Sequence, residues 1–307
     1  MASPTTKFNQ LPRIIFLMLG VLVIFVSSHL LRQCAQKPEP TSHVSKYQRI
    51  IALAPSSVEI IYQLGLEDRL VGVSRFCHYP PEAASKPVVG GYLDLDFESV
   101  LRLKPDCVIL LDEQHLLAKR LQQLNIKTIS VDHASTGGII HSIHVIGETL
   151  DKSTEAKTIT NSLRNRILAV EKNSSHINPK PRVLVCISRD TTANHPDRII
   201  ASGNAGVHQE YITIAGGENA YQGAIAYPSI SREKLIQMDP DIIIDLVTED
   251  TWNQTGEKKL LSQWSTYAEL KAVQNKRIIF IHENKHLIPG PRFTDTLEVF
   301  AQAINPK

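Results

Sequence analysis

The feature that most constrains this sequence is a pattern that occurs twice, on either side of a long amphipathic segment. The chain reads DFESVLRLKPDCVILLD before that segment and ISREKLIQMDPDIIIDLV after it. When Glu98 is aligned with Glu233, a Pro-Asp pair coincides in both copies and an apolar run follows it. Each copy predicts a short helix, a proline stop and a buried parallel strand. The repeat therefore indicates two related α/β lobes.

The segment between the two copies, from Ser153 to Asn173, predicts one long helix. Its apolar residues recur at steps of three and four, which places them on one stripe: Ala156, Ile159, Leu163, Ile167 and Val170. Asp151 or Ser153 can cap the start of this helix. At about 1.5 Å per residue the helix is roughly 30 Å long, the breadth of a small domain. We therefore predict two lobes joined by one rigid helix.

The whole chain divides into five expected parts. These are a signal peptide or membrane anchor (1–28), a linker (29–48), an N-terminal α/β lobe (49–150), the interlobe helix (151–175) and a C-terminal α/β lobe (176–307). Lobes of about 100–150 residues are long enough for each to bury a core of its own. The net charge of +2 does not favour nucleic-acid binding, and we expect no such partner.

The N-terminal segment has the pattern of an export signal. Two basic residues precede an apolar run from Ile14 to Val26, which is short for a membrane span and suits a signal peptide. Small residues permit cleavage after Ser28, and an uncleaved membrane tether through residues 14–31 is the alternative. Cys34 follows arginine and glutamine rather than the small residues that lipidation requires. We expect the remainder of the chain to lie outside the cytoplasm, in the periplasm.

The first lobe opens with a strand, a helix and a second strand. Ile50–Leu53 and Leu70–Val73 are the expected strands, Ser56 or Ser57 is the expected helix cap, and Gly65 ends the helix. This order implies a right-handed parallel unit. The turn before the helix lies where open α/β sheets bind ligands. No glycine-rich phosphate-binding motif follows, so we expect no nucleotide or other cofactor.

The cysteines do not predict a metal site. Cys107 and Cys186 lie in apolar runs of different lobes, where we expect buried thiols. The sequence contains no CxxC motif and no regular Cys/His spacing. We therefore predict no structural metal.

Aromatic, imidazole and cationic side chains gather in the predicted loops and favour a ligand cleft. They are Phe76, His78, Tyr79 and Tyr92 in the first lobe, with Tyr227, His286 and Arg292 in the second. Such rings can form a wall for a flat or bulky ligand, although any one of them could simply cover the edge of its lobe. A carboxylate-rich ligand would pair with Arg292, which could equally be a solvated surface cation.

The segments APSSVEIIYQLGLEDRLVGVS, HYPPEA, VGGYLDLDFESVLRLKPD, IAGGEN and YPSISREKLIQMDPDIII together resemble the periplasmic binding proteins for cobalamin and ferric siderophores. The resemblance runs from about residue 49 to the end. It implies the class III periplasmic-binding-protein fold, with two Rossmann-like lobes, one backbone helix and a ligand cleft that faces away from it. It further implies a monomeric binding protein, not an enzyme, that delivers a metal chelate to the permease dimer and ATPase of an ABC importer.

The resemblance also suggests a role for the paired glutamates. In this family one glutamate on each lobe meets arginines of the two permease subunits, and Glu98 and Glu233 match those positions. The repeat agrees, because two equivalent carboxylates suit a partner with two-fold symmetry. Alternatively, each glutamate only complements the positive end of its own helix.

For the pocket, the resemblance implies roles for Phe76, Tyr92 and Tyr227, which match aromatic positions of cobalamin binders. Leu111 stands where one type of member has a further tryptophan. In haem receptors of this fold a tyrosine or histidine ligates the iron, so Tyr92 or His78 could be an axial ligand.

Two other hypotheses remain open. A receptor for a bare transition metal would need convergent ligands, and its candidates are His78, His208, His282 and His286. An exported two-lobed enzyme would draw on Ser56, Asp94, Asp96 and His133. No nucleophile elbow, paired-acid motif or metal-hydrolase signature joins these polar groups.

Overall fold

The computed structural model describes residues 46–306, which belong to one compact unit. The predicted export signal, its cleavage after Ser28, the membrane tether and Cys34 lie outside the described residues. Within the described part of the chain, no helix combines the length and the apolar character needed to cross a bilayer.

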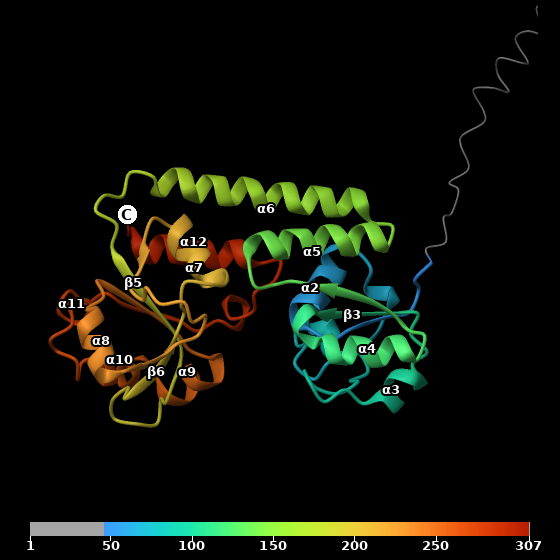
Figure 1. Cartoon of the computed structure of the whole chain (residues 1–307), viewed down its shortest axis with the longest axis horizontal. Coiled ribbons are helices and arrows are strands. Elements are labelled where there is room, and N and C mark those ends of the chain that lie inside the picture. Colours follow the sequence, from blue (N-terminus) through green and yellow to red (C-terminus); the bar gives the residue numbers. More distant parts are fainter. Residues whose placement is uncertain (1–45, 307) are drawn as a thin grey trace, which may run out of the picture. The chain divides into compact units, whose positions relative to one another are not determined.

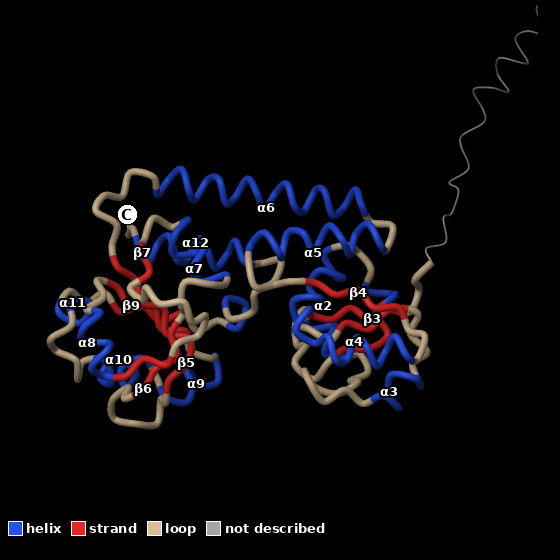
Figure 2. Tube along the Cα trace, viewed as in Figure 1, coloured by secondary structure: helices blue, strands red, loops and turns tan. Residues whose placement is uncertain are grey.

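The first lobe is built on a four-stranded parallel sheet in the order β2-β1-β3-β4. Figure 2 shows the strands of this lobe in red among its blue helices. Its strands are β1 (Ile50–Ala52), β2 (Leu70–Val73), β3 (Cys107–Leu111) and β4 (Lys127–Val131). Its helices are α2 (Pro55–Gln63), α3 (Phe97–Arg102), α4 (His115–Gln123) and α5 (Thr136–Thr149). Alternate strand residues enter separate hydrophobic clusters, Ile50 in one and Ile51 in the other, so both faces of the sheet are covered.

The second lobe contains a mixed sheet in the order β10-β9-β5-β6-β8, with β7 paired to β5. Its strands are β5 (Arg182–Arg189), β6 (Arg198–Ala201), β7 (Glu218–Asn219), β8 (Ser229–Ser231), β9 (Ile242–Leu246) and β10 (Ile278–Ile281). Its helices are α7 (Val207–Ile214), α8 (Arg232–Met238), α9 (Glu249–Thr255), α10 (Glu257–Trp264), α11 (Lys271–Gln274) and α12 (Phe293–Ile304). Strands β5, β7, β9 and β10 pair in parallel, whereas β6 and β8 form an antiparallel edge.

The structure confirms the internal repeat at the level of individual hydrogen bonds. Asp106 accepts bonds from the backbone N–H groups of Gln48 and Arg49, at 2.7 and 3.1 Å. In the same way, Asp241 accepts a bond of 2.8 Å from the N–H of Arg182. Both aspartates directly precede a central strand, β3 or β9. Each carboxylate therefore holds the start of the neighbouring first strand of its lobe, β1 or β5.

The helix before each of these aspartates ends in the same way. The residue in front of the proline has a positive φ in both copies, 46° at Lys104 and 41° at Asp239. The arginine beside each first strand also donates to the end of that helix, since Arg49 bonds the carbonyls of residues 103 and 104 and Arg182 bonds the carbonyl of Met238. The proline stop predicted from the sequence is therefore confirmed in both lobes.

The predicted long helix is α6, Ser153–Ser174, and it packs on α5 of the first lobe and on α12 and α7 of the second (Figure 1). Close packing against α5 depends on Gly147, where a Cβ would lie 2.4 Å from the Cβ of Ala156. The predicted cap is wrong. Lys152 occupies the cap position, and its side chain makes no capping hydrogen bond. Asp151 precedes it in a left-handed conformation with φ of 60°.

The predicted serine cap of α2 is also wrong. Pro55 occupies the first turn of the helix, which makes Ala54 the cap residue. Ser56 and Ser57 therefore lie inside α2, where both are buried. Gly65 follows the end of α2 with φ of 67°, so the predicted glycine stop is confirmed.

We expect Asp106→Asn and Asp241→Asn each to lower the free energy of unfolding by about 1–3 kcal/mol, because backbone N–H groups would lose a charged acceptor. Urea denaturation followed by circular dichroism measures the change. Glu171→Gln, on the exposed face of α6, is the control and should change stability by less than about 0.5 kcal/mol. Native-like unfolding of either aspartate variant would show that these bonds do not stabilise the repeat.

Candidate functional site

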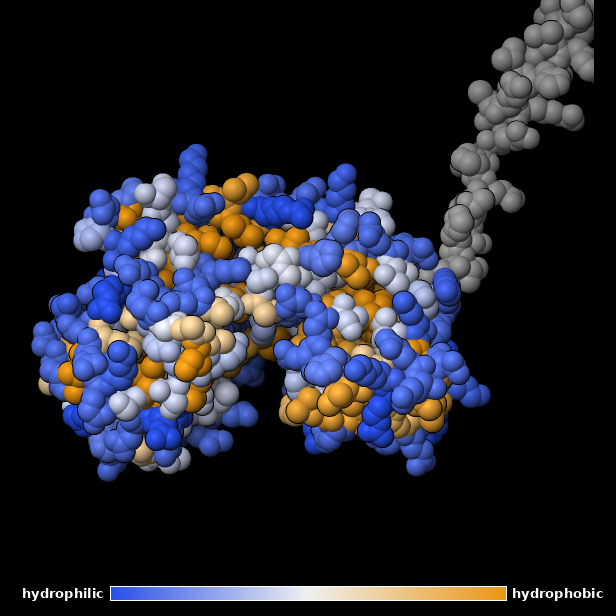
Figure 3. Space-filling model, viewed as in Figure 1, coloured by the Kyte–Doolittle hydropathy of each residue, from blue (hydrophilic) through white to orange (hydrophobic). Residues whose placement is uncertain are grey.

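A cavity of about 510 Å³ lies between the two lobes, and we call it the interlobe cavity. Figure 3 shows the surface hollowed between the lobes on the side away from α6. The lining residues come from the segments that follow strands β2, β9 and β10, at the carboxyl ends where parallel sheets bind ligands. They are Phe76, His78 and Tyr79 from the first lobe, and Glu249, Glu283, Asn284, Lys285, Leu287, Ile288 and Arg292 from the second.

A contact between the lobes lies at the wall of the interlobe cavity. Arg292 donates two hydrogen bonds to Glu59, of 2.8 Å from Nε and 2.6 Å from a terminal nitrogen. The guanidinium also lies 3.8 Å from the centre of the Tyr79 ring. Glu59 belongs to α2 and Arg292 directly precedes α12, so this pair joins the first lobe to the second.

The ionisation of this pair reflects its burial. Burial raises the pKa of Glu59, and the hydrogen bonds from Arg292 offset only part of that rise. Burial lowers the pKa of Arg292, but the hydrogen bonds and charge of Glu59, together with Tyr79 and Asp295, outweigh it, so the pKa of Arg292 is raised. The bidentate geometry is that of an ion pair, and we treat both groups as charged at neutral pH.

Of the six side chains predicted to bind ligand, the structure brings three to the interlobe cavity: Phe76, His78 and Arg292. Phe76 is 51% exposed, so its ring is available to a ligand. Arg292 lies in the wall, where Glu59 accepts hydrogen bonds from two of its donors.

The other three predicted side chains do not line this cavity. Tyr92 donates its hydroxyl to Glu113. Tyr227 is exposed on the second lobe. His286 is buried, with its Nδ1 3.1 Å from the hydroxyl of Thr296. Burial lowers the pKa of His286, which suits a structural role behind the cavity wall.

Sequence reasoning missed Glu59, Glu249, Glu283 and Lys285. One signal could have found Glu59, because a carboxylate inside the apolar run Val58–Ile61 must be paired if it is buried. The other three follow strands β9 and β10 directly, and their positions at strand ends were the available signal.

The four histidines of the bare-metal hypothesis do not converge. His208 packs against the rings of Tyr211 and Phe300, and His282 stacks on Trp252 with ring centres 4.0 Å apart. His286 is held by Thr296. Among residues 46–306, no three His, Cys, Asp or Glu side chains are grouped so as to hold a metal ion.

The polar groups of the enzyme hypothesis come together only in part. Ser56 Oγ and His133 Nδ1 lie 2.7 Å apart. Both residues are buried, and a Cβ on Gly290 would lie 3.0 Å from the Cβ of Ser56. Asp94 pairs instead with Arg75, and Asp96 caps α3. The described residues therefore form a covered Ser-His contact without a carboxylate to orient it.

Glu98 and Glu233 occupy the same position in their helices, the second residue of α3 and of α8. Glu98 is almost fully exposed and lies 3.6 Å from Arg102. Glu233 is exposed and accepts a 2.7 Å hydrogen bond from the hydroxyl of Ser231. That bond lowers the pKa of Glu233.

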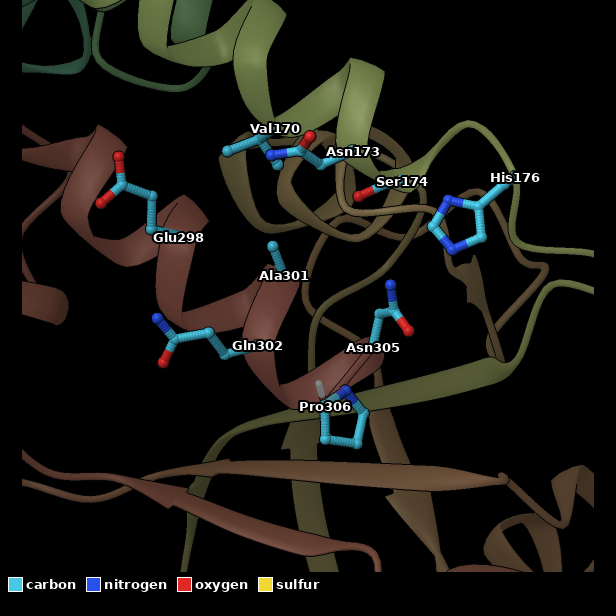
Figure 4. Close-up of a pocket in the computed structure, with 9 residues that line it drawn as sticks. All are labelled: Val170, Asn173, Ser174, His176, Glu298, Ala301, Gln302, Asn305 and Pro306. Atoms are coloured by element: carbon cyan, nitrogen blue, oxygen red, sulfur yellow. The ribbon is translucent and has the colours of Figure 1, made fainter.

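A larger cavity, of about 940 Å³, lies between the end of α6 and α12 and is shown in Figure 4. Its lining is mostly amide and small side chains, including Asn173, Gln302 and Asn305. No residue predicted to bind ligand lies in it.

Comparison with known proteins identifies the group to which this architecture belongs. Residues 50–285 match the family model described as periplasmic binding protein. The chain belongs to the periplasmic binding protein family. This membership agrees with two lobes that enclose a cavity at the carboxyl ends of their strands. It also makes the chain a member of a solute-binding family rather than of an enzyme family.

Individual relatives agree with this assignment. The vitamin B12-binding protein of Photorhabdus laumondii is 25% identical over 261 residues, which cover 84% of this chain and 88% of the relative. The crystal structure of the periplasmic vitamin B12-binding protein of Vibrio cholerae is 24% identical with a TM-score of 0.71, and the match covers 84% of this chain and 96% of that one. A periplasmic haem-binding protein of Vibrio cholerae has the same TM-score at 22% identity, with 84% and 100% covered.

We expect the stability of the protein to fall as the pH decreases below 6.5. Burial lowers the pKa of His133 from 6.5 to about 4, so the folded state stays unprotonated where the unfolded chain takes up a proton. The free energy of unfolding should therefore decrease by about 2 kcal/mol between pH 7 and pH 5 on account of His133. His208, whose pKa burial also lowers to about 4, contributes in the same direction.

Urea denaturation of His133→Asn at pH 7 and pH 5 measures this contribution. The variant should lose less stability on acidification than the native chain does. His141→Asn, at an exposed position of α5, is the matched control and should retain the native dependence. An unchanged pH dependence in His133→Asn would contradict the assignment.

Proposed function

We propose that this protein is the substrate-binding component of an ABC importer, which captures a metal chelate in the interlobe cavity and delivers it to an inner-membrane permease. The observation that carries the proposal is a cavity lined from both lobes, at the carboxyl ends of the strands, in a chain of the periplasmic binding protein family. Binding proceeds without covalent change to the ligand.

The walls of the cavity support a bulky ligand with a flat face. Phe76 and Tyr79 are each about half exposed at the cavity, and Leu287 and Ile288 supply apolar surface from the opposite lobe. Relatives named as vitamin B12-binding proteins make cobalamin the first ligand to test, with ferric siderophores next. The chelate itself is the ligand, and the protein needs no resident cofactor or metal for this role.

Haem is the second candidate ligand, and His78 is the observation that favours it. Its exposed imidazole lines the interlobe cavity and could ligate iron. Tyr92, the other predicted axial ligand, is bonded to Glu113 away from the cavity lining.

The paired glutamates support docking to a permease dimer and its ATPase. Glu98 and Glu233 are exposed and occupy equivalent positions of the repeat, one on each lobe. A partner with two-fold symmetry and paired basic pockets would fit such a pair. Exposed ion pairs add little affinity individually, so these contacts would mainly orient the complex.

The same proposal includes the remaining organisation of the chain. Residues 1–28 act as a signal peptide or anchor and 29–48 as a linker, and the folded part works in the periplasm as a monomer. Lobes 49–150 and 176–307, joined by the helix at 151–175, would close by a small rotation because α6 packs along both of them.

Native mass spectrometry with absorbance, on the full chain in mild detergent, tests the ligand assignment. We expect a one-to-one complex with one of cyanocobalamin, haem or a ferric siderophore. Phe76→Ala should weaken that complex about 10- to 100-fold through loss of a buried aromatic contact. Leu168→Ala, at a 60% exposed position of α6, should leave the affinity unchanged. Tight uptake of zinc or manganese without any chelate complex would contradict the proposal.

The docking role is tested by Glu98→Ala combined with Glu233→Ala. Transport into proteoliposomes that contain the cognate permease should fall at least about tenfold, since both orienting carboxylates are lost. Chelate affinity should stay native, because neither glutamate lines the interlobe cavity. Undiminished transport would show that the glutamates only complement their own helices.

A further inference from the structure

Arg292 is the more buried of the two cationic side chains, Arg292 and Lys285, that line the interlobe cavity, and its donors are not available to a ligand. The Arg292 side chain is 16% exposed and the Glu59 side chain only 3%. Glu59 takes two of the guanidinium donors, and Tyr79 covers the face of the group. A free arginine in this position would bind a ligand carboxylate through the same fork of donors.

The position of Glu59 does not follow from the needs of its own lobe. Glu59 lies in the first turns of α2, among buried neighbours such as Val58 and Ile60. Burying a carboxylate is costly unless it is paired. The partner that offsets this cost comes from the other lobe, so the pair serves the interlobe region rather than the packing of α2.

Carboxylates outnumber cations in the rest of the described surroundings. Lys285 pairs with Glu283 at 2.6 Å, and Glu249 adds a further carboxylate to the lining. The Tyr79–Arg292 contact also borders a second cavity of about 660 Å³, whose lining holds the carboxylates of Glu67, Asp68 and Glu82 and one further cation, Lys86. Lys86 donates a 2.9 Å hydrogen bond to the backbone carbonyl of Glu67. With Arg292 neutralised by Glu59, the described surroundings of the interlobe cavity are negative.

We propose that Glu59 is a specificity-determining residue, which occupies the donors of Arg292 so that the interlobe cavity rejects chelates with several free carboxylates. The ligand class that the cavity then favours is a chelate without net negative charge at its periphery. This inference rests on the proposed function, and it adds a charge selection to the chelate-binding cavity.

Two variants distinguish charge selection from a purely structural role, in which the Glu59–Arg292 ion pair only holds the lobes together. Replacing Glu59 with glutamine keeps the shape of the side chain but removes its charge, which leaves Arg292 as an unpaired cation in the wall. Combining Glu59→Gln with Arg292→Gln removes both charges. If the ion pair is purely structural, the two variants should have the same affinity for an anionic chelate. If Glu59 selects by charge, only the single variant should gain such affinity.

The experiment is calorimetric titration of the full chain, in mild detergent, with cyanocobalamin as an uncharged chelate and ferric citrate as a polyanionic one. The native chain should prefer cyanocobalamin. Glu59→Gln should gain at least about tenfold in affinity for ferric citrate, and the double variant should lose that gain. Circular dichroism verifies that each variant is folded.

A folded Glu59→Gln variant that gains no affinity for ferric citrate would overturn the proposal, as would a native chain that prefers the polyanion. If the native chain binds neither of these two chelates, haem and a ferric siderophore are titrated next, and the proposed function fails only if the native chain binds none of the four. Titration of Glu59→Gln with free citrate then decides the inference separately. Citrate binding by that variant and not by the native chain supports the charge filter, and its absence from both overturns it.

Discussion

The buried contact between Glu59 and Arg292 is the interaction on which the site depends most. It joins residues that lie 233 positions apart in the sequence, one in each lobe, with both donor–acceptor distances below 3 Å. One further contact joins the two lobes, and another ties the second lobe to the interlobe helix. Thr136 donates its N–H and its hydroxyl to Glu210, and α6 is tied to α12 by the ion pair of Arg166 with Asp295.

These contacts relate the fold to the mode of ligand capture. Helix α6 packs on both lobes, and the Glu59–Arg292 pair joins them beside the cavity, so a large separation of the lobes would leave buried charges unpaired. A small rotation is therefore the motion that this architecture favours. A partner that acts on both lobes at once, through Glu98 and Glu233, would be well placed to open the cavity.

The sequence predicted the features that arise from local patterns. Helix α6, the prolines that end α3 and α8, and the burial of Cys107 and Cys186 are confirmed, because periodicity and backbone restriction act over a few residues. The serine caps were wrong because Pro55 shifts the start of α2. The pairing of Glu59 with Arg292 could not be predicted, since it requires both lobes to be packed together. For the same reason, the sequence did not show that three of the six residues predicted to bind ligand lie outside the lining of the interlobe cavity.

The central claim is that a chelate binds between the lobes while Glu59 retains both hydrogen bonds from Arg292. A crystal structure of the protein with the chelate that it binds most tightly tests this claim most directly. We predict that the chelate contacts Phe76 in the interlobe cavity and that both Arg292–Glu59 hydrogen bonds persist. A chelate bound between α6 and α12, or an Arg292 that has left Glu59 to contact the chelate, would contradict the account.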